Sequence, residues 1–85
     1  MQHEIRVVNY PGSLDELARE IGSMRYDVLV SFLQYLGDDL MRQAESDRAK
    51  GRVILANKLE LTAQEIYQAR DQMNSAWNIC KKHMK

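Results

Sequence analysis

The sequence has 85 residues, 45% of them hydrophobic and 28% charged, and its 12 basic side chains balance 12 acidic ones. This length predicts one domain (1–85) with a small core, and zero net charge provides no field to attract nucleic acid or an anionic membrane. One cysteine excludes an internal disulfide, and without a signal peptide or an apolar run near the ~20 residues that span a bilayer, we expect a cytoplasmic protein with no membrane contact.

Residues 1–12 are expected to form an extended or flexible N-terminal arm. Within it, residues 4–8 read Glu-Ile-Arg-Val-Val and are rich in β-branched side chains, which favour extended backbone. Everything downstream reads as helix, so this segment has no strand to pair with in the chain. It either packs or frays beside the helices, or it pairs with a second copy or a partner's sheet edge. Pro11 and Gly12 then end the arm.

A short helix is predicted over about 14–22. Ser13 and Glu16 have capping-box spacing, and the apolar side chains that follow have helical spacing: Leu14, Leu17, Ala18 and Ile21. The segment Ser-Leu-Asp-Glu-Leu-Ala-Arg-Glu-Ile-Gly (13–22) resembles the first helix of many helix-turn-helix DNA-binding domains. That resemblance implies a short basic recognition helix after it. The chain instead continues after Gly22 and Ser23 into a long apolar helix that is not strongly basic at its start, so the DNA contacts of that family are not carried over.

Two long helices, about 24–50 and 52–83, are predicted from matching apolar rows. The first row is Tyr26, Leu29, Leu33, Leu36, Leu40, Gln43 and Asp47; the second is Leu55, Leu59, Thr62, Ile66, Ala69, Met73, Ala76, Cys80 and His83. Gly37 interrupts the first helix, either by allowing a close approach or kink, or by breaking it with Asp38 and Asp39 as a cap.

Gly51 lies between the rows, at a position where a helix C-cap favours glycine. A bend there makes an antiparallel hairpin, in which the rows pair as Leu40 with Thr62, Leu36 with Ile66, Leu33 with Ala69, Leu29 with Met73 and Tyr26 with Ala76. The competing prediction is one unbroken helix through Gly51, which costs about 1 kcal/mol relative to alanine.

The two ends of this hairpin should differ. Near the bend the first row turns polar at Gln43 and Asp47, so we expect a wetter, looser tip. At the open end the apolar stripe widens to include Val30, Phe32, Trp77 and Ile79, and we expect the helix at 14–22 to cover it. The predicted fold class is therefore all-α, a helical hairpin with a short third helix that dimerises into a four-helix-type bundle.

No catalytic, cofactor or metal site is predicted. Cys80 and His83 share one helical face, but Cys80 occupies a core position, where a thiol acts as a small hydrophobe. Two ligands are also fewer than zinc requires. The carboxylates Asp38 and Asp39 point about 100° apart on a helix and do not converge.

Six apolar residues fall outside the predicted hairpin interior: Val28, Tyr35, Met41, Ile54, Leu61 and Tyr67. The predicted binding residues are four of these, Tyr35, Ile54, Leu61 and Tyr67. A second stripe of this kind is typical of a helix that contacts two neighbours. The leading hypothesis is a small non-enzymatic interaction, adaptor or regulatory protein that acts through helix packing, with a second copy or another protein as partner. The alternative is a nucleic-acid-associated regulator that uses a basic hairpin tip, Arg48, Lys50 and Arg52. A bundle that binds a small ligand or metal near Trp77 is a third hypothesis.

Overall fold

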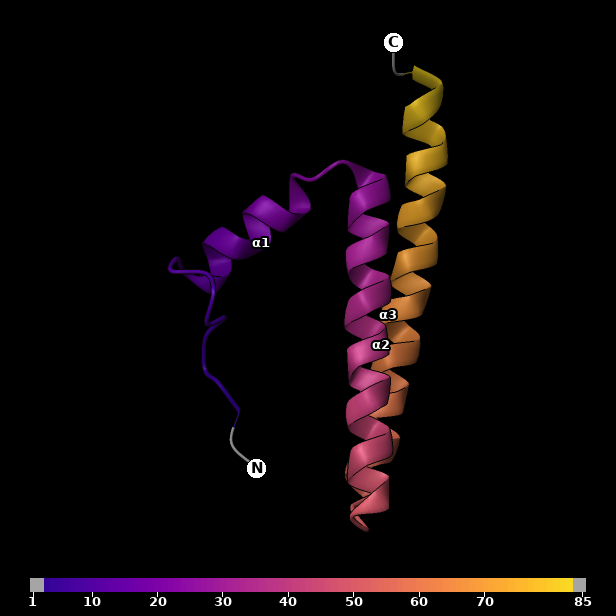
Figure 1. The fold of residues 1–85 in the computed structure, drawn as a ribbon. Coiled ribbons are helices and arrows are strands. Elements are labelled where there is room, and N and C mark those ends of the chain that lie inside the picture. The colour runs from indigo at the N-terminus through magenta and orange to yellow at the C-terminus, as the bar shows by residue number, and fades with distance from the viewer. Residues whose placement is uncertain (1–2, 84–85) are drawn as a thin grey trace.

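The computed structural model describes residues 3–83, and that part of the chain forms three α-helices and one 3₁₀ turn, with no strand. The elements are α1 (Leu14–Gly22), α2 (Tyr26–Ala49), α3 (Val53–Cys80) and η1 (Lys81–His83). α2 and α3 lie side by side and antiparallel, and α1 projects from their open end (Figure 1). The predicted all-α hairpin with a short N-terminal helix is therefore confirmed.

The bend at Gly51 is a Schellman motif. Gly51 has φ +82°, a conformation that glycine adopts without a Cβ penalty. Its amide donates to the Arg48 carbonyl at 3.0 Å, and the Arg52 amide donates to the Asp47 carbonyl at 2.8 Å. These bonds satisfy carbonyls at the end of α2 and reverse the chain into α3. The alternative of one straight helix through Gly51 is wrong.

The first turn of α1 carries the predicted serine cap. The Glu16 amide donates to Ser13 Oγ at 3.1 Å. The Glu16 carboxylate accepts from the Ser13 hydroxyl at 3.2 Å rather than from the Ser13 backbone amide, so the capping box is formed on one side only.

Small residues line the contact between α2 and α3. Gly37 and Ala44 of α2 and Ala56 and Ala63 of α3 are buried, and each pair is spaced by seven residues. Because they carry little or no side chain, the helices approach closely along this stripe. Gly37 remains helical and lies under the Tyr67 ring, which confirms a close approach there instead of a break.

The predicted pairing of the large apolar rows is wrong in part, because four of the five predicted pairs include an exposed residue. Leu36 was expected opposite Ile66, but it is 39% exposed, and Leu55 is 48% exposed. Thr62 and Ala69, the predicted partners of Leu40 and Leu33, are also exposed. The contact runs along the glycine and alanine stripe, and the larger side chains are displaced to one side of it.

The hairpin tip is closed, contrary to the expectation of a wet tip. Ala44 and Ala56 are fully buried, and Asp47 is only 3% exposed. Asp47 Oδ1 accepts from Arg52 Nη1 at 2.9 Å. This ion pair satisfies the buried carboxylate, so polar residues in the first row do not loosen the tip.

The third helix does not cover the open end. α1 stands away from the hairpin in Figure 1 and does not pack along α2 or α3. Ile79, which α1 was expected to cover, is 62% exposed. Within residues 3–12 the arm has no strand, only a turn in which the Tyr10 amide donates to the Val7 carbonyl at 3.1 Å. Ile5 in this arm is 94% exposed.

Candidate protein interaction surface

The stripe of small residues divides the hairpin into two broad faces of different chemistry. Successive helical residues point about 100° apart, so the buried stripe determines which side chains flank it on each side. On one side lies a polar face, defined by Gln34, Asp38 and Arg48 of α2 and Asn57, Glu60, Tyr67 and Arg70 of α3. On the other side lies a leucine face, defined by Leu29, Leu33, Leu36 and Leu40 of α2 and Leu55, Leu59, Ile66 and Met73 of α3.

Hydrogen bonds across the polar face join the two long helices at three levels. Near the tip, Arg48 Nη2 donates to Asn57 Oδ1 at 2.9 Å, and Arg48 also pairs with Glu60. At the middle, Tyr67 Oη donates to Asp38 Oδ1 at 2.6 Å. Toward the open end, Arg70 donates to the Gln34 side-chain oxygen. Each bond has one partner on each helix, so together they specify the register of α2 against α3.

The bond between Tyr67 and Asp38 changes the titration of both groups. Hydrogen bonds from Tyr67 and then Gln34 stabilise the carboxylate and lower the pKa of Asp38. The same bond stabilises the protonated phenol and raises the pKa of Tyr67. The pair therefore favours the charged Asp38 and the neutral Tyr67 in the folded hairpin.

The leucine face is only partly covered. Six of its members are half-buried, and Leu36 and Leu55 are more exposed than the rest. Within residues 3–83 no large side chain is fully buried; the fully buried apolar residues are three alanines. The hairpin thus presents most of its large aliphatic side chains along one face, where a second layer of helix would cover them.

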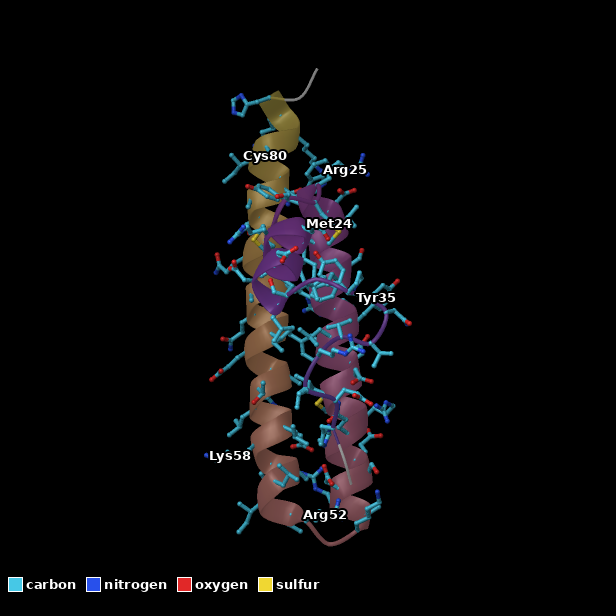
Figure 2. The ribbon with its side chains drawn as sticks, turned by 90° about the vertical axis from the view of Figure 1, so that its left-hand side faces the viewer. Met24, Arg25, Tyr35, Arg52, Lys58 and Cys80 are labelled. Carbon is cyan, nitrogen blue, oxygen red and sulfur yellow. The ribbon has the colours of Figure 1, made fainter. Side chains whose placement is uncertain are left out.

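Three of the predicted binding residues lie on the outer edges of the hairpin and do not form one patch. Tyr35 precedes buried Gly37 by two residues, so it points away from α3 and is 71% exposed (Figure 2). Ile54 and Leu61 precede Ala56 and Ala63 by the same step and occupy the outer edge of α3. They are 81% and 52% exposed. The structure therefore separates Tyr35 from Ile54 and Leu61 on opposite edges.

Tyr67, the fourth predicted binding residue, lies between the two helices. A Cβ built on Gly37 would meet the Tyr67 ring at 2.5 Å, and its hydroxyl bonds Asp38 across the contact. Arg70 lies over the same ring, 4.9 Å from its centroid. The prediction that Tyr67 lies outside the hairpin interior is wrong, because glycine at position 37 leaves room for the ring there.

The basic residues predicted for nucleic acid are mostly engaged within the hairpin. Arg48 binds Asn57 and Glu60, and Arg52 binds Asp47. Lys50 is exposed at the tip. Two of the three cations thus already face carboxylates, which leaves little uncompensated charge for phosphates.

A small open pocket of about 190 Å³ lies at the open end, lined by Met24, Arg25, Tyr26, Trp77 and Cys80. Arg25 stacks over the Trp77 ring at 5.6 Å and pairs with Asp27. Cys80 is half-buried and His83 is exposed. Among residues 3–83 no three metal-ligating side chains converge, and no helix there is long and apolar enough to cross a membrane.

Comparisons with known proteins add no relative: no family, no curated protein and no solved structure matches this chain. Sequence reasoning missed the stripe of small residues at the helix contact, and with it the leucine face. The available signal was the seven-residue spacing of Gly37 with Ala44 and of Ala56 with Ala63.

Proposed function

We propose that this chain is a non-enzymatic interaction protein whose leucine face binds helices, with a second copy as its partner in a four-helix bundle. The observation that carries the proposal is the open leucine face. A two-helix layer leaves one apolar side of each helix uncovered, and a second layer on that side completes the core.

The exposed area of the chain supports a partner of substantial size. The protein exposes 6662 Å², whereas a compact monomer of this length exposes about 5,200 Å². Its radius of gyration is 15.4 Å, against about 12 Å for a compact domain. A stable interface buries about 800 Å² on each partner, and the excess area here is larger than that.

Two neighbouring residues allow a matched test. Leu36 belongs to the leucine face, and Tyr35 lies on the outer edge of the same helix turn. Leu36→Glu would place a charge in the interface and weaken self-association by about 100-fold or more. Tyr35→Glu and Leu61→Glu on the edges should leave association within a few-fold of the parent protein. Sedimentation velocity measures the association state, and far-UV circular dichroism checks that each variant keeps its helices.

The opposite result is also informative. If Tyr35→Glu and Leu61→Glu dissociate the protein while Leu36→Glu does not, the edges form the interface. If the parent protein sediments as a monomer at tens of micromolar, the second copy is not its partner and the homodimer is disproved.

A further inference from the structure

Helix α1 has an apolar side that its own hairpin does not cover. Leu14, Leu17, Ala18 and Ile21 share that side, none of them is buried, and Leu14 is 62% exposed. α1 joins the hairpin only through the short connector at its C-terminal end (Figure 1). An amphipathic helix of this kind is stabilised by packing its apolar side against another element.

Local hydrogen bonds end α1 and begin α2 on either side of the connector. Ser23 Oγ donates to the Arg19 carbonyl at 2.7 Å, and the Met24 amide donates to the Ile21 carbonyl at 3.1 Å. Arg25 then pairs with Asp27 in the first turn of α2 at 2.6 Å. In the structure α1 stands away from α2 and α3 (Figure 1), with its apolar side available to another molecule.

The hairpin tip has a second uncovered apolar cluster. Val53 and Ile54 are 50% and 81% exposed on sides of α3 that point away from the leucine face. Two exposed lysines flank them, Lys50 at the end of α2 and Lys58 one turn into α3. Lys58 points outward in Figure 2. The tip is thus apolar with a basic border.

The charge on α1 is complementary to that border. α1 carries Asp15, Glu16 and Glu20 against one cation, Arg19, which pairs with Asp15. The acidic side chains therefore outnumber the basic one on α1, whereas the tip contributes exposed lysines. An apolar surface with an acidic border matches an apolar surface with a basic one, and such matching orients two surfaces as they meet.

These two surfaces cannot meet within one chain. α2 has 24 residues and spans about 36 Å between the α1 connector and the tip, whereas α1, with 9 residues, spans about 13 Å. We infer that α1 of one copy packs on the tip of a second copy, at Val53 and Ile54, with Glu20 beside Lys58. This inference rests on the proposed dimer and sets its direction: the two hairpins lie antiparallel, so each α1 covers the partner's tip.

Cysteine pairs test this contact directly. In a Cys80→Ser background, Ala18→Cys and Ile54→Cys chains are unfolded together in urea, refolded as a mixture and oxidised. The expected product is a disulfide-linked 18–54 dimer on non-reducing gels. The matched control mixes Ala18→Cys with Ile79→Cys, since Ile79 is also exposed but lies at the open end; no crosslink is expected there.

Charge reversal provides an independent readout. Glu20→Lys and Lys58→Glu should each weaken the dimer about fivefold, and the double variant should return to within about twofold of the parent. Lys82→Glu at the open end is the control and should change the dissociation constant less than about twofold. A double variant no tighter than either single variant would overturn the assigned contact.

The outcomes separate this inference from the proposal on which it rests. Dimers that crosslink at 18–79, or at neither pair, overturn the placement of α1 and leave the four-helix dimer standing. Mixtures that sediment as monomers before oxidation refute the dimer itself. A crosslink at 18–54 in a dimer that Leu36→Glu dissociates supports both.

Discussion

At the scale of single residues, Gly37 and Tyr67 set the distance between the long helices. The Tyr67 ring lies where a side chain at position 37 would project, at 2.5 Å from a Cβ built there. Alanine is otherwise the better helix former by about 1 kcal/mol. Glycine at position 37 therefore weakens α2 locally and allows the ring to pack between the helices.

Gly37→Ala is expected to destabilise the hairpin by about 1–3 kcal/mol, because the Tyr67 ring must leave its position. The matched background is Tyr67→Ala, which removes the ring. In that background the same substitution should stabilise α2 by up to about 1 kcal/mol. Urea unfolding followed by circular dichroism measures both values, and equal effects in the two backgrounds would contradict the role given to the ring.

The pair of Asp38 and Tyr67 makes hairpin stability depend on pH at both extremes. Because the bond lowers the pKa of Asp38, its contribution is present above the pKa of an unfolded aspartate and is lost as the pH falls through the lower, folded value. Because the bond raises the pKa of Tyr67, its contribution is present below the pKa of an unfolded tyrosine, about 10, and is lost as the pH rises through the folded value.

We therefore expect stability to be level near neutral pH and to fall both in acid below about pH 4 and in alkali above about pH 10. Tyr67→Phe should reduce the alkaline fall and part of the acidic one. Urea midpoints at acidic, neutral and alkaline pH measure these slopes. An unchanged alkaline slope in Tyr67→Phe would show that this bond does not couple folding to pH.

At the scale of elements, the bend and the start of α1 are encoded by short local patterns. Ser13 caps α1 through the Glu16 amide, and Gly51 takes the positive φ that ends α2. Both depend on one or two residues and their immediate neighbours. This is why these elements could be predicted from the sequence within a few residues.

Gly51→Ala should destabilise the hairpin by about 1–2 kcal/mol, since an alanine at φ +82° is strained. Gly22→Ala is the matched control. Gly22 does not have positive φ, and a Cβ there meets nothing within 4 Å, so hairpin stability should be unchanged or slightly raised. Chemical unfolding of the two variants in parallel checks the difference; a loss of similar size in both would argue against strain at the bend.

The faces of α2 and α3 could not be chosen correctly from hydrophobicity. Leu36 and Gly37 are adjacent, as are Leu55 and Ala56, so the large and small rows run side by side about 100° apart. If the faces of each helix are ranked by the apolar area that they would bury, the leucine rows are favoured as the contact between the helices. Close approach along the small residues, together with the cross-helix bonds of Asp38, Arg48 and Arg70, selects the other row.

At the scale of the whole molecule, the outward position of α1 could not be predicted from the sequence either. The apolar side of α1 predicts that something covers it, but the pattern does not say whether that is its own hairpin or a partner. The hydrogen bonds at Ser23 and Met24 close the end of α1 and do not join it to the hairpin. Covering of the open end would need packing between α1 and the hairpin, which the local pattern does not encode.

If two copies share one core, thermal stability must depend on protein concentration. We expect the unfolding midpoint to rise by about 3–6 °C for each tenfold increase in concentration. Leu36→Glu should remove that dependence while retaining helical structure at low temperature. Circular dichroism melts over a hundredfold range of concentration measure it, and a midpoint that does not move would mean that the monomer folds alone.

The two faces of the hairpin contribute differently to the contact between α2 and α3. Glycine, alanines and the polar bonds of Asp38, Arg48 and Arg70 hold α2 against α3, so the leucine row beside them supplies only part of the contact between the helices. Substitutions at its two most exposed members, Leu36 and Leu55, should therefore alter the proposed binding surface while the hairpin keeps its shape. The hairpin is in this sense a fixed scaffold whose exposed aliphatic residues can vary.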